Sequence, residues 1–260
     1  MNNQVNSSII VTATIIIIIF SSITLLSIST SFSIFTITKT ATGGEMRNYK
    51  NTILKDIEAF GQKEDKVAPI IKNSKILDFH GENYADVVNS NDINLNSFTI
   101  SLWFKSEMNV TGNDIAFLLN KGGLGTERFG YNLNYGIWLD NREKINGGFE
   151  AITGENYFLT SQESFADGFW HNTILTFDEN LHLLKLYIDG LEVATNSTLI
   201  GVTPDNTGIQ TVRLGANSLV EKGQINGNYT GQLDDIQVWD FAFTKPQVTS
   251  LFNTESKITR

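Results

Sequence analysis

The stretch from Phe165 to Thr195 constrains the fold most, because it contains three β segments joined by two short turns. Apolar residues recur at every second position from Leu184 to Ile188, which is the period of a half-buried strand. Asp189-Gly190 follows directly and favours a type I′ hairpin turn, since both central residues of that turn need a positive φ. Such a meander predicts an antiparallel sheet within a β-sandwich or barrel.

The composition is consistent with one large all-β domain and excludes several function classes. Of the 260 residues, 41% are hydrophobic and 11% aromatic, which is enough for one sizeable core. The formal net charge of −9 argues against nucleic-acid binding, which needs a basic surface. The chain has no cysteine, so disulfides, thiolate metal sites and cysteine nucleophiles are excluded. Because secreted eukaryotic modules often carry disulfides, the composition favours a prokaryotic cell surface.

Three segments occur in the order typical of one known family of β domains. The first ends a strand in Phe-x-Gly and continues into "FTISLWF", the second is "DGFWHNTILTFD" followed by "LKLYIDG", and the third is "GQLDDIQVW" with a short helix after it. Together they resemble the laminin-G-like, concanavalin A-type jelly-roll modules over residues 75–253. The resemblance implies an all-β fold, an antiparallel two-sheet jelly-roll sandwich. That fold hosts many functions.

The N-terminal region predicts a membrane-spanning helix. Residues 1–38 carry no charged side chain, and about 20 apolar residues such as 9–28 can cross a bilayer as a helix. A cleaved signal peptide is the alternative and would make the protein secreted, but the basic n-region and a good cleavage site are missing. We expect an uncleaved anchor, so that the membrane is a partner through residues 9–28.

Two arguments predict opposite orientations of the anchor in the membrane. Lys39, Arg47 and Lys50 follow the span, and positive-inside reasoning would keep the large domain in the cytoplasm. The family resemblance implies the opposite, because such modules are typically extracytoplasmic. We follow the resemblance and expect a membrane-anchored protein with its domain outside the cell.

The remaining N-terminal residues predict a short stalk. Between Glu45 and Phe60 apolar residues step by three or four, which indicates an amphipathic helix, and Gly61 follows at the position where a helix ends. The chain is therefore expected to contain an anchor or signal segment over 1–42, a helical stalk or linker over 43–68, and the jelly-roll domain over 69–260.

The sequence carries no recognisable catalytic motif. The three histidines are scattered, His171 follows Trp170 in a motif whose role is packing, and neither G-x-S-x-G nor a P-loop occurs. Laminarinase-type hydrolases of the same fold carry E-x-D-x-x-E, the paired carboxylates of retaining chemistry, and that string is absent. We therefore expect a non-catalytic protein.

One stretch predicts a ligand-binding face. Alternation from Phe129 to Leu139 indicates a strand, and amide, carboxylate and aromatic groups of the kind that bind sugars occur along it, at Asn132, Asn134, Trp138 and Asp140. The sequence thus predicts a surface module that binds a glycan or a protein of the cell envelope. Two alternatives stay open. The tryptophan could pack under a loop beside ordinary solvent-facing asparagines, or the domain could be a structural or assembly part of an envelope complex.

The closing strand predicts a metal site. Period 2 puts Asp234 on the same face as Ile236 and Val238, and a carboxylate among core residues must be hydrogen-bonded, paired or metal-bound. The resemblance implies a structural calcium held by this aspartate and by oxygens near the opening Phe-x-Gly, here Gly81 and the adjacent Glu82. The alternative is that Asp234 only accepts backbone N–H hydrogen bonds.

Overall fold

The structure is a computed structural model that describes residues 16–18, 34–36, 68–87, 91–107, 115–124, 131–218 and 226–257. The chain divides into two compact units, Met1–Val67 and Ala68–Arg260. In the first unit β1 (Ile16–Ile18) pairs antiparallel with β2 (Ile34–Thr36). The other elements that the structure describes all belong to the second unit.

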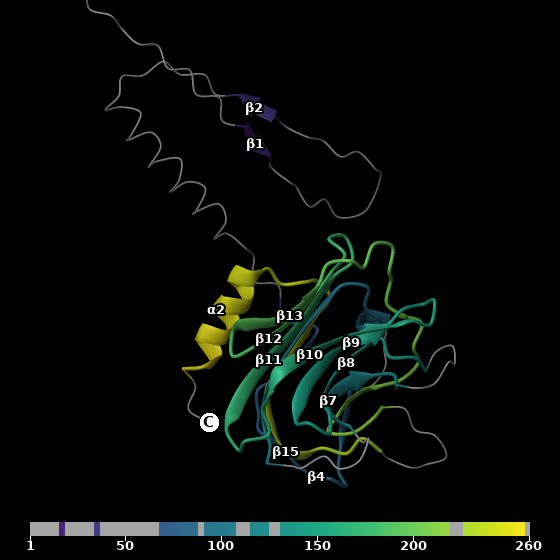
Figure 1. Ribbon diagram of the computed structural model, residues 1–260, viewed down its shortest axis with the longest axis vertical. Helices are drawn as coiled ribbons and strands as arrows, with labels where there is room; N and C mark the ends of the chain where they lie inside the picture. The colour runs from purple at the N-terminus through teal and green to yellow at the C-terminus, as the bar shows by residue number, and fades with distance from the viewer. Residues whose placement is uncertain are drawn as a thin grey trace, which may run out of the picture. The chain divides into compact units, whose positions relative to one another are not determined.

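The second unit is a sandwich of two antiparallel sheets (Figure 1). The six-stranded sheet has the order β10 (Asn156–Ser164), β9 (Lys144–Glu150), β8 (Tyr135–Leu139), β7 (Ala116–Lys121), β14 (Val212–Leu214) and β5 (Ala85–Val87). The seven-stranded sheet has the order β13 (Leu191–Asn196), β12 (Leu183–Ile188), β11 (Trp170–Asp178), β6 (Phe98–Lys105), β15 (Thr230–Trp239) and β3 (Ile71–Asn73), with β4 (Leu77–His80) also paired to β15. A 3₁₀ turn (Asn91–Ile93) and α2 (Lys245–Glu255) complete the described elements. The predicted all-β, antiparallel two-sheet sandwich is confirmed.

The core lies between the sheets and follows the period-2 pattern of the strands. Along β6, Phe98, Ile100, Leu102 and Phe104 are fully buried in the main hydrophobic cluster. The ring of Phe98 lies 5.9 Å from that of Phe177 on its own sheet. It lies 6.3 Å, edge-on, from the ring of a phenylalanine in the opposite sheet. Burying each such side chain contributes roughly 2 kcal/mol, so the alternation in β6 adds substantially to the stability of the core.

The β12–β13 hairpin has the turn that its sequence predicts. Asp189 and Gly190 both have a positive φ, 49° and 75°. A Cβ atom on Gly190 would lie 2.8 Å from Cδ1 of Phe252 in α2. The glycine is therefore required twice, by the turn and by the close approach of the helix.

The C-terminal helix α2 covers the outer face of the seven-stranded sheet (Figure 1). The ring of Phe252 stacks on that of Trp103 with centroids 5.8 Å apart. The indole Nε1–H of Trp103 donates to Glu255 Oε2 at 2.8 Å. Val248 is fully buried in a cluster with Ile174. Residues that alternate outward from β6 and β11 are therefore also shielded from water, and both faces of this sheet are packed.

A buried lysine ties the long segment between β13 and β14 to the six-stranded sheet. Lys121, the last residue of β7, is fully buried, and its Nζ donates to the carbonyl oxygens of Gly208 at 3.0 Å and Gln210 at 2.8 Å. Burial lowers the pKa of its ammonium group to about 8.

The N-terminal predictions fall mainly outside the described residues. Of the expected membrane span, 9–28, only Ile16–Ile18 is described, and the expected stalk helix, 45–60, is not described. Within the described ranges, no helix combines the length and the hydropathy needed to cross a membrane. The anchor, the stalk and the three-part division of the chain stay predictions.

Candidate functional site

An aromatic row crosses the outer face of the six-stranded sheet. Because Ile137 and Leu139 point into the core, Trp138 between them points outward from β8. Its ring lies 5.9 Å from that of Phe117 in β7 and 5.0 Å, edge-to-face, from that of Phe158 in β10. Trp138 is only 4% exposed, whereas Phe158 is 37% exposed. The row, defined as Phe117, Trp138 and Phe158, therefore presents one accessible ring supported by two buried ones.

A chain of polar side chains runs beside this row on the same face. Thr160 Oγ1, in β10, donates to Asn146 Oδ1, in β9, at 2.6 Å. The Asn146 side chain also hydrogen-bonds Asp140, just beyond β8. Asp140 in turn accepts from Nη2 of Arg142 at 2.7 Å, and the Arg142 side chain is 64% exposed. We call Thr160, Asn146, Asp140 and Arg142 the polar ladder.

The charge state of the ladder is set by Asp140. Burial acts to raise the pKa of this carboxyl group, but hydrogen bonds from the side chain and backbone of Arg142 and from the backbone of Lys144 lower the pKa below its usual value. The carboxylate is therefore ionised at neutral pH and fixes the guanidinium of Arg142 in one orientation. The edge of the Arg142 guanidinium that faces solvent therefore has a fixed orientation.

A second exposed ring lies at the other edge of the same sheet. The guanidinium of Arg213, in β14, lies 3.8 Å from the ring centroid of Tyr84, which is 42% exposed. Asp86 holds Arg213 through two hydrogen bonds of 2.7 and 2.8 Å. Since strands lie about 4.8 Å apart, the five steps from β10 to β5 separate these two strands by about 24 Å across this face.

The four residues predicted to bind ligand are all buried, and the structure brings only two of them to this face. Trp138 belongs to the aromatic row, and Asp140 belongs to the polar ladder. Asn134 instead exchanges two hydrogen bonds with the backbone of Leu95, at 3.0 and 2.9 Å, and Asn132 donates to Asp205 at 3.1 Å. These amides cross-link loops. Direct contact of the four residues with a ligand is untested and stays a prediction.

The sequence reasoning missed the exposed side chains Phe158 and Arg142 and the half-buried Thr160. A signal for two of them was present, because Tyr157 and Leu159 are apolar positions of β10 that pack in the core, which places Phe158 and Thr160 on the outer face. The predicted strand from 129 to 139 also began too early, since β8 starts at Tyr135 and residues 125–130 lie outside the described part of the chain.

The prediction that Asp234 faces the core is wrong. Leu233 and Ile236 both belong to the core cluster, although they are three residues apart. The β15–β6 register shifts between Asp234 and Gln237, and Asp235 has a φ of 44°, so an extra residue bulges out of β15 at this point. Asp234 pairs with Trp103 on the face covered by α2, where its Oδ1 accepts the N–H of Asp235 at 2.8 Å.

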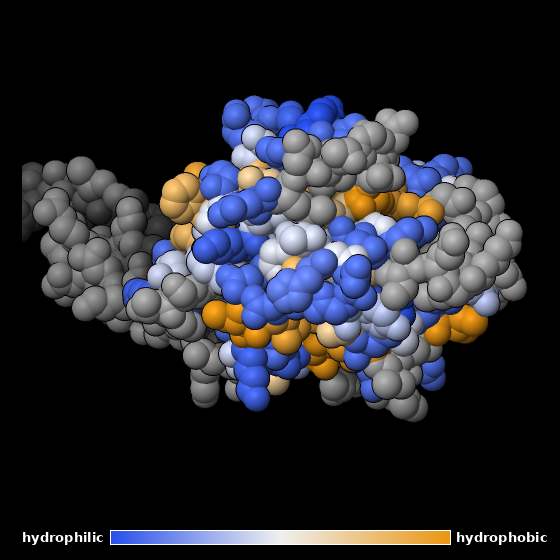
Figure 2. All heavy atoms as spheres, turned by 90° about the horizontal axis from the view of Figure 1, so that it is seen from below, coloured by the Kyte–Doolittle hydropathy of each residue, from blue (hydrophilic) through white to orange (hydrophobic). Residues whose placement is uncertain are grey.

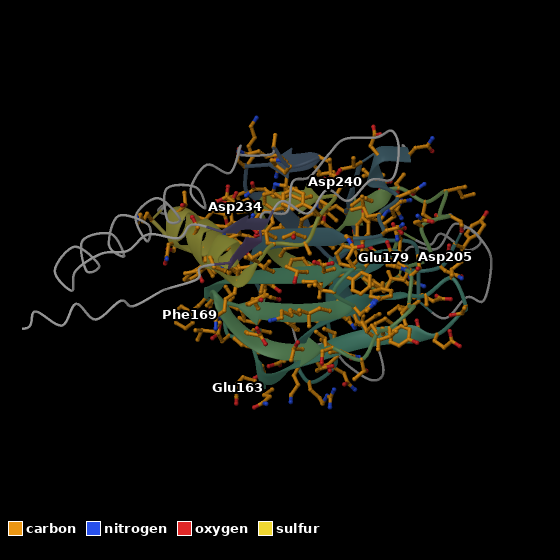
Figure 3. The ribbon with its side chains drawn as sticks, turned by 90° about the horizontal axis from the view of Figure 1, so that it is seen from above. Glu163, Phe169, Glu179, Asp205, Asp234 and Asp240 are labelled. Atoms are coloured by element: carbon orange, nitrogen blue, oxygen red, sulfur yellow. The ribbon has the colours of Figure 1, made fainter. Side chains whose placement is uncertain are left out.

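The three predicted calcium ligands are not brought together. Register pairs Leu233 with Leu77, so Asp234 lies at least four positions along β4 from Gly81, a separation of about 13 Å. Gly81 follows β4 and donates its N–H to Tyr229 O at 3.1 Å, and Glu82 beside it is exposed. Within the described ranges, no three His, Asp or Glu side chains gather as a metal ion would require. Figure 3 shows Asp234 beside α2, far from Asp205 near Asn132.

Comparison with known proteins agrees with the two-sheet architecture. A laminin G-type family model, described as the concanavalin A-like lectin/glucanases superfamily, matches residues 79–249. The chain belongs to this superfamily. A search of curated proteins gives no significant match.

Solved structures similar to this concanavalin A-like domain include sialidase-associated modules and a toxin domain. A leech intramolecular trans-sialidase aligns with a TM-score of 0.59 and 19% identity over 74% of this chain, which spans only 28% of that protein. The CBM40 of a Ruminococcus gnavus IT-sialidase, bound to α2,6-sialyllactose, aligns with a TM-score of 0.58 and 17% identity over 71% of this chain and 100% of its own. The binding domain of botulinum neurotoxin serotype G gives 0.52 and 10% over 74% of this chain and 46% of its own. At these identities the similarity shows the fold alone.

The concanavalin A-like domain also has a shallow groove at the end of the seven-stranded sheet. It measures about 290 Å³, lies where β6 ends and β15 begins, and is lined by Lys105, Ser106, Glu107, Thr230, Gly231 and Gln232. Figure 2 looks onto this end of the domain, where hydrophilic side chains dominate and apolar ones form separate patches. No aromatic ring lines the groove, so the aromatic row is the better candidate for a ligand platform.

His171 forms a clip between two turns of the domain. Its Nδ1 lies 2.8 Å from Asp189 Oδ2, and its Nε2 lies 3.1 Å from Asp167 Oδ1. The hydrogen bond with Asp189 raises the pKa of the imidazole against the opposing effect of burial, and Asp167 adds to the rise. The ring packs against Phe104 and Phe165. This arrangement ties the turn before β11 to the β12–β13 hairpin.

Proposed function

We propose that the domain is a non-catalytic glycan-binding module whose ligand binds on the aromatic row and the polar ladder. The observation that carries this proposal is the exposed ring of Phe158, held edge-to-face against Trp138 on the same sheet face as the polar ladder. An aromatic ring packs against the apolar C–H face of a sugar, and neighbouring polar groups select its hydroxyls.

The ring of Phe158 is already ordered before a ligand arrives. Its edge-to-face contact with Trp138 at 5.0 Å fixes its orientation. Ordering a rotamer-rich side chain on binding costs about 0.5–1.5 kcal/mol, and the buried part of the row removes much of that cost. A surface of this kind suits a weakly interacting ligand such as a sugar ring.

The polar ladder supplies both donors and an acceptor on the same face as the ring. The hydroxyl of Thr160 donates its hydrogen to Asn146, so the lone pairs of the hydroxyl oxygen can accept a hydrogen bond from a ligand. Arg142 has five N–H donors and uses its Nε and Nη2 on Asp140. Because Asp140 balances the charge of Arg142, the ladder favours a hydroxyl-rich ligand over a polyanion, as does the net charge of −9.

Similar structures support the ligand class. The Ruminococcus gnavus module is seen bound to α2,6- and α2,3-sialyllactose. Sialylated and neutral oligosaccharides are therefore the first probes. The missing E-x-D-x-x-E string supports a role without catalysis.

A substitution pair of full-length chains tests the proposal. Phe158→Ser should weaken glycan binding about tenfold, which corresponds to about 1.4 kcal/mol lost with the aromatic contact, as measured by isothermal titration calorimetry. Phe169→Ser is the matched control, because Phe169 is 70% exposed on the turn before β11 and is not part of the row (Figure 3). Equal effects of the two substitutions would refute the site.

A glycan array probed with the wild-type chain tests the module itself. Binding to no glycan, together with co-purification in an envelope complex, would favour the alternative of a structural or assembly domain.

We also propose that residues 9–28 anchor the protein in a membrane with the domain outside the cell. The uncharged N-terminal stretch supports the anchor, and the resemblance to modules that are typically extracytoplasmic supports the orientation. Protease added to intact cells should remove the domain. Protection until lysis would support the cytoplasmic orientation that the basic residues after the span favour.

Calcium binding by the domain stays a proposal that rests on the family resemblance. The geometry separates Asp234 from Gly81 and Glu82, so one ion cannot use all three.

A further inference from the structure

The chain contains an Asn-x-Thr tripeptide where β13 leaves the sheet. Asn196 is the last residue of β13, and the next two residues, Ser197 and Thr198, are exposed. Asn196 Oδ1 accepts two hydrogen bonds, from Thr198 N at 2.9 Å and from Thr198 Oγ1 at 2.8 Å. The tripeptide is therefore closed into a turn by its own first and third side chains.

This turn leaves the amide nitrogen of Asn196 as the reactive end of the side chain. Both donors of Thr198 bind the oxygen, and within the described residues Nδ2 of Asn196 has no hydrogen-bond partner. Two donors on the amide oxygen draw electron density toward it and make the N–H more acidic. Asn-x-Ser/Thr is the acceptor pattern for N-linked glycosylation, and the attached glycan needs an exposed segment.

A second tripeptide of the same pattern, Asn228-Tyr229-Thr230, is held quite differently. Tyr229 is fully buried, and its hydroxyl donates to Lys105 O at 2.8 Å. Its backbone N–H donates to Gly215 O at 2.8 Å and its carbonyl accepts from Gly81 N at 3.1 Å. The Oδ1 of Asn228 is buried without a hydrogen-bond partner, so no turn closes on it. This segment cannot leave the domain without breaking the core.

We propose that Asn196 is an N-glycosylation site of the folded protein and that Asn228 is not. The donor would be an oligosaccharide linked through phosphate to a membrane lipid. Nδ2 of Asn196 would form a bond to C1 of the first sugar while the bond between C1 and the phosphate oxygen breaks. The lipid phosphate would leave with the electron pair, and the amide proton would pass to a base of the transferase. In the cell this rests on the outside location proposed above.

The position of Asn196 gives such a glycan a structural consequence. β13 is the last strand of the seven-stranded sheet, so one side of its backbone is not covered by a further strand of that sheet. Free strand edges are sites of edge-to-edge association, and proteins commonly shield them. A bulky glycan at the end of β13 would hinder a second chain from pairing along that edge.

The experiment uses the purified, folded full-length chain, a membrane oligosaccharyltransferase and a lipid-linked oligosaccharide. The transferase is first chosen for its ability to modify two synthetic peptides, 192–202 and 224–234, so that each tripeptide is known to be a substrate without the fold. Peptide mass spectrometry should then find the folded chain modified at Asn196 and unmodified at Asn228.

Two substitutions separate the turn from the motif. Ser197→Ala keeps both the motif and the turn and should still be modified, whereas Thr198→Ala removes both and should not. A folded chain left unmodified at Asn196, or modified at Asn228 as fast as at Asn196, would overturn the inference. Because the reaction is carried out in vitro, its failure is distinguishable from failure of the proposed location or of glycan binding.

Discussion

Replacing Lys121 by methionine should change how stability depends on pH. The two side chains have similar length, but methionine carries no charge. In the wild type the ammonium group is fully buried at the end of β7 and donates to the carbonyl oxygens of Gly208 and Gln210. These hydrogen bonds do not compensate fully for lost hydration, and burial lowers the pKa from 10.5 to about 8.

The size of the effect follows from the two pKa values. They differ by about 2.5, and at about 1.4 kcal/mol per pKa unit the charged form costs the folded state about 3 kcal/mol at pH 7. Between about pH 8 and 10.5 the unfolded chain binds more protons at this residue than the folded chain, so stability rises with pH there. Between pH 7 and 9.5 the free energy of unfolding of the wild type should gain about 2 kcal/mol from this residue.

Urea denaturation at pH 7, 8, 9 and 9.5 measures this gain. The Lys121→Met chain should lack it, so that the stability difference between variant and wild type changes by about 2 kcal/mol across the series. Lys72→Met serves as the control, because Lys72 is exposed on β3 and its removal changes net charge equally. Parallel pH profiles for wild type and Lys121→Met would refute the argument that the buried ammonium costs stability.

Three further outcomes are expected. Because the pKa of His171 is raised, its protonated form stabilises the fold fully below the unfolded pKa near 6.5, and this stabilisation is lost as pH rises through the folded pKa. The melting temperature of the wild type should therefore fall across that pH range. His171→Gln should abolish this fall, and Asp189→Asn should make it smaller. Asp234→Ala should cost about 1–3 kcal/mol because a buried acceptor is lost, and EGTA should shift the melting temperatures of variant and wild type equally; a response abolished by the substitution would restore Asp234 as a calcium ligand. Residues 63–260 should fold alone with a β-type circular dichroism spectrum, and a helix-dominated spectrum would contradict the sandwich.

Features set by neighbouring residues were predictable from the sequence. The turn at Asp189-Gly190 depends only on which residues tolerate positive φ, and the inward positions of β6 depend only on alternation. The candidate site depends instead on pairing between strands distant in sequence. Thr160 meets Asn146 because β10 pairs with β9, and the ladder reaches Asp140 because β9 pairs with β8. Alternation near residue 132 pointed to Asn132 and Asn134, which instead hydrogen-bond the Asp205 side chain and the Leu95 backbone.

The closing strand β15 shows how energetic costs decide where strict alternation of side chains fails. With Leu233 and Ile236 three positions apart, strict period 2 would put either an aspartate or an apolar side chain on the wrong face. An unpaired buried carboxylate costs many kcal/mol, whereas one residue in the left-handed region costs about 1–2 kcal/mol, and aspartate tolerates that region better than most residues. The cheaper solution is an extra residue at Asp235, φ 44°, which returns Ile236 to the core and keeps Asp234 out of it. Two adjacent aspartates between core residues therefore favour a bulge over an inward-facing metal ligand.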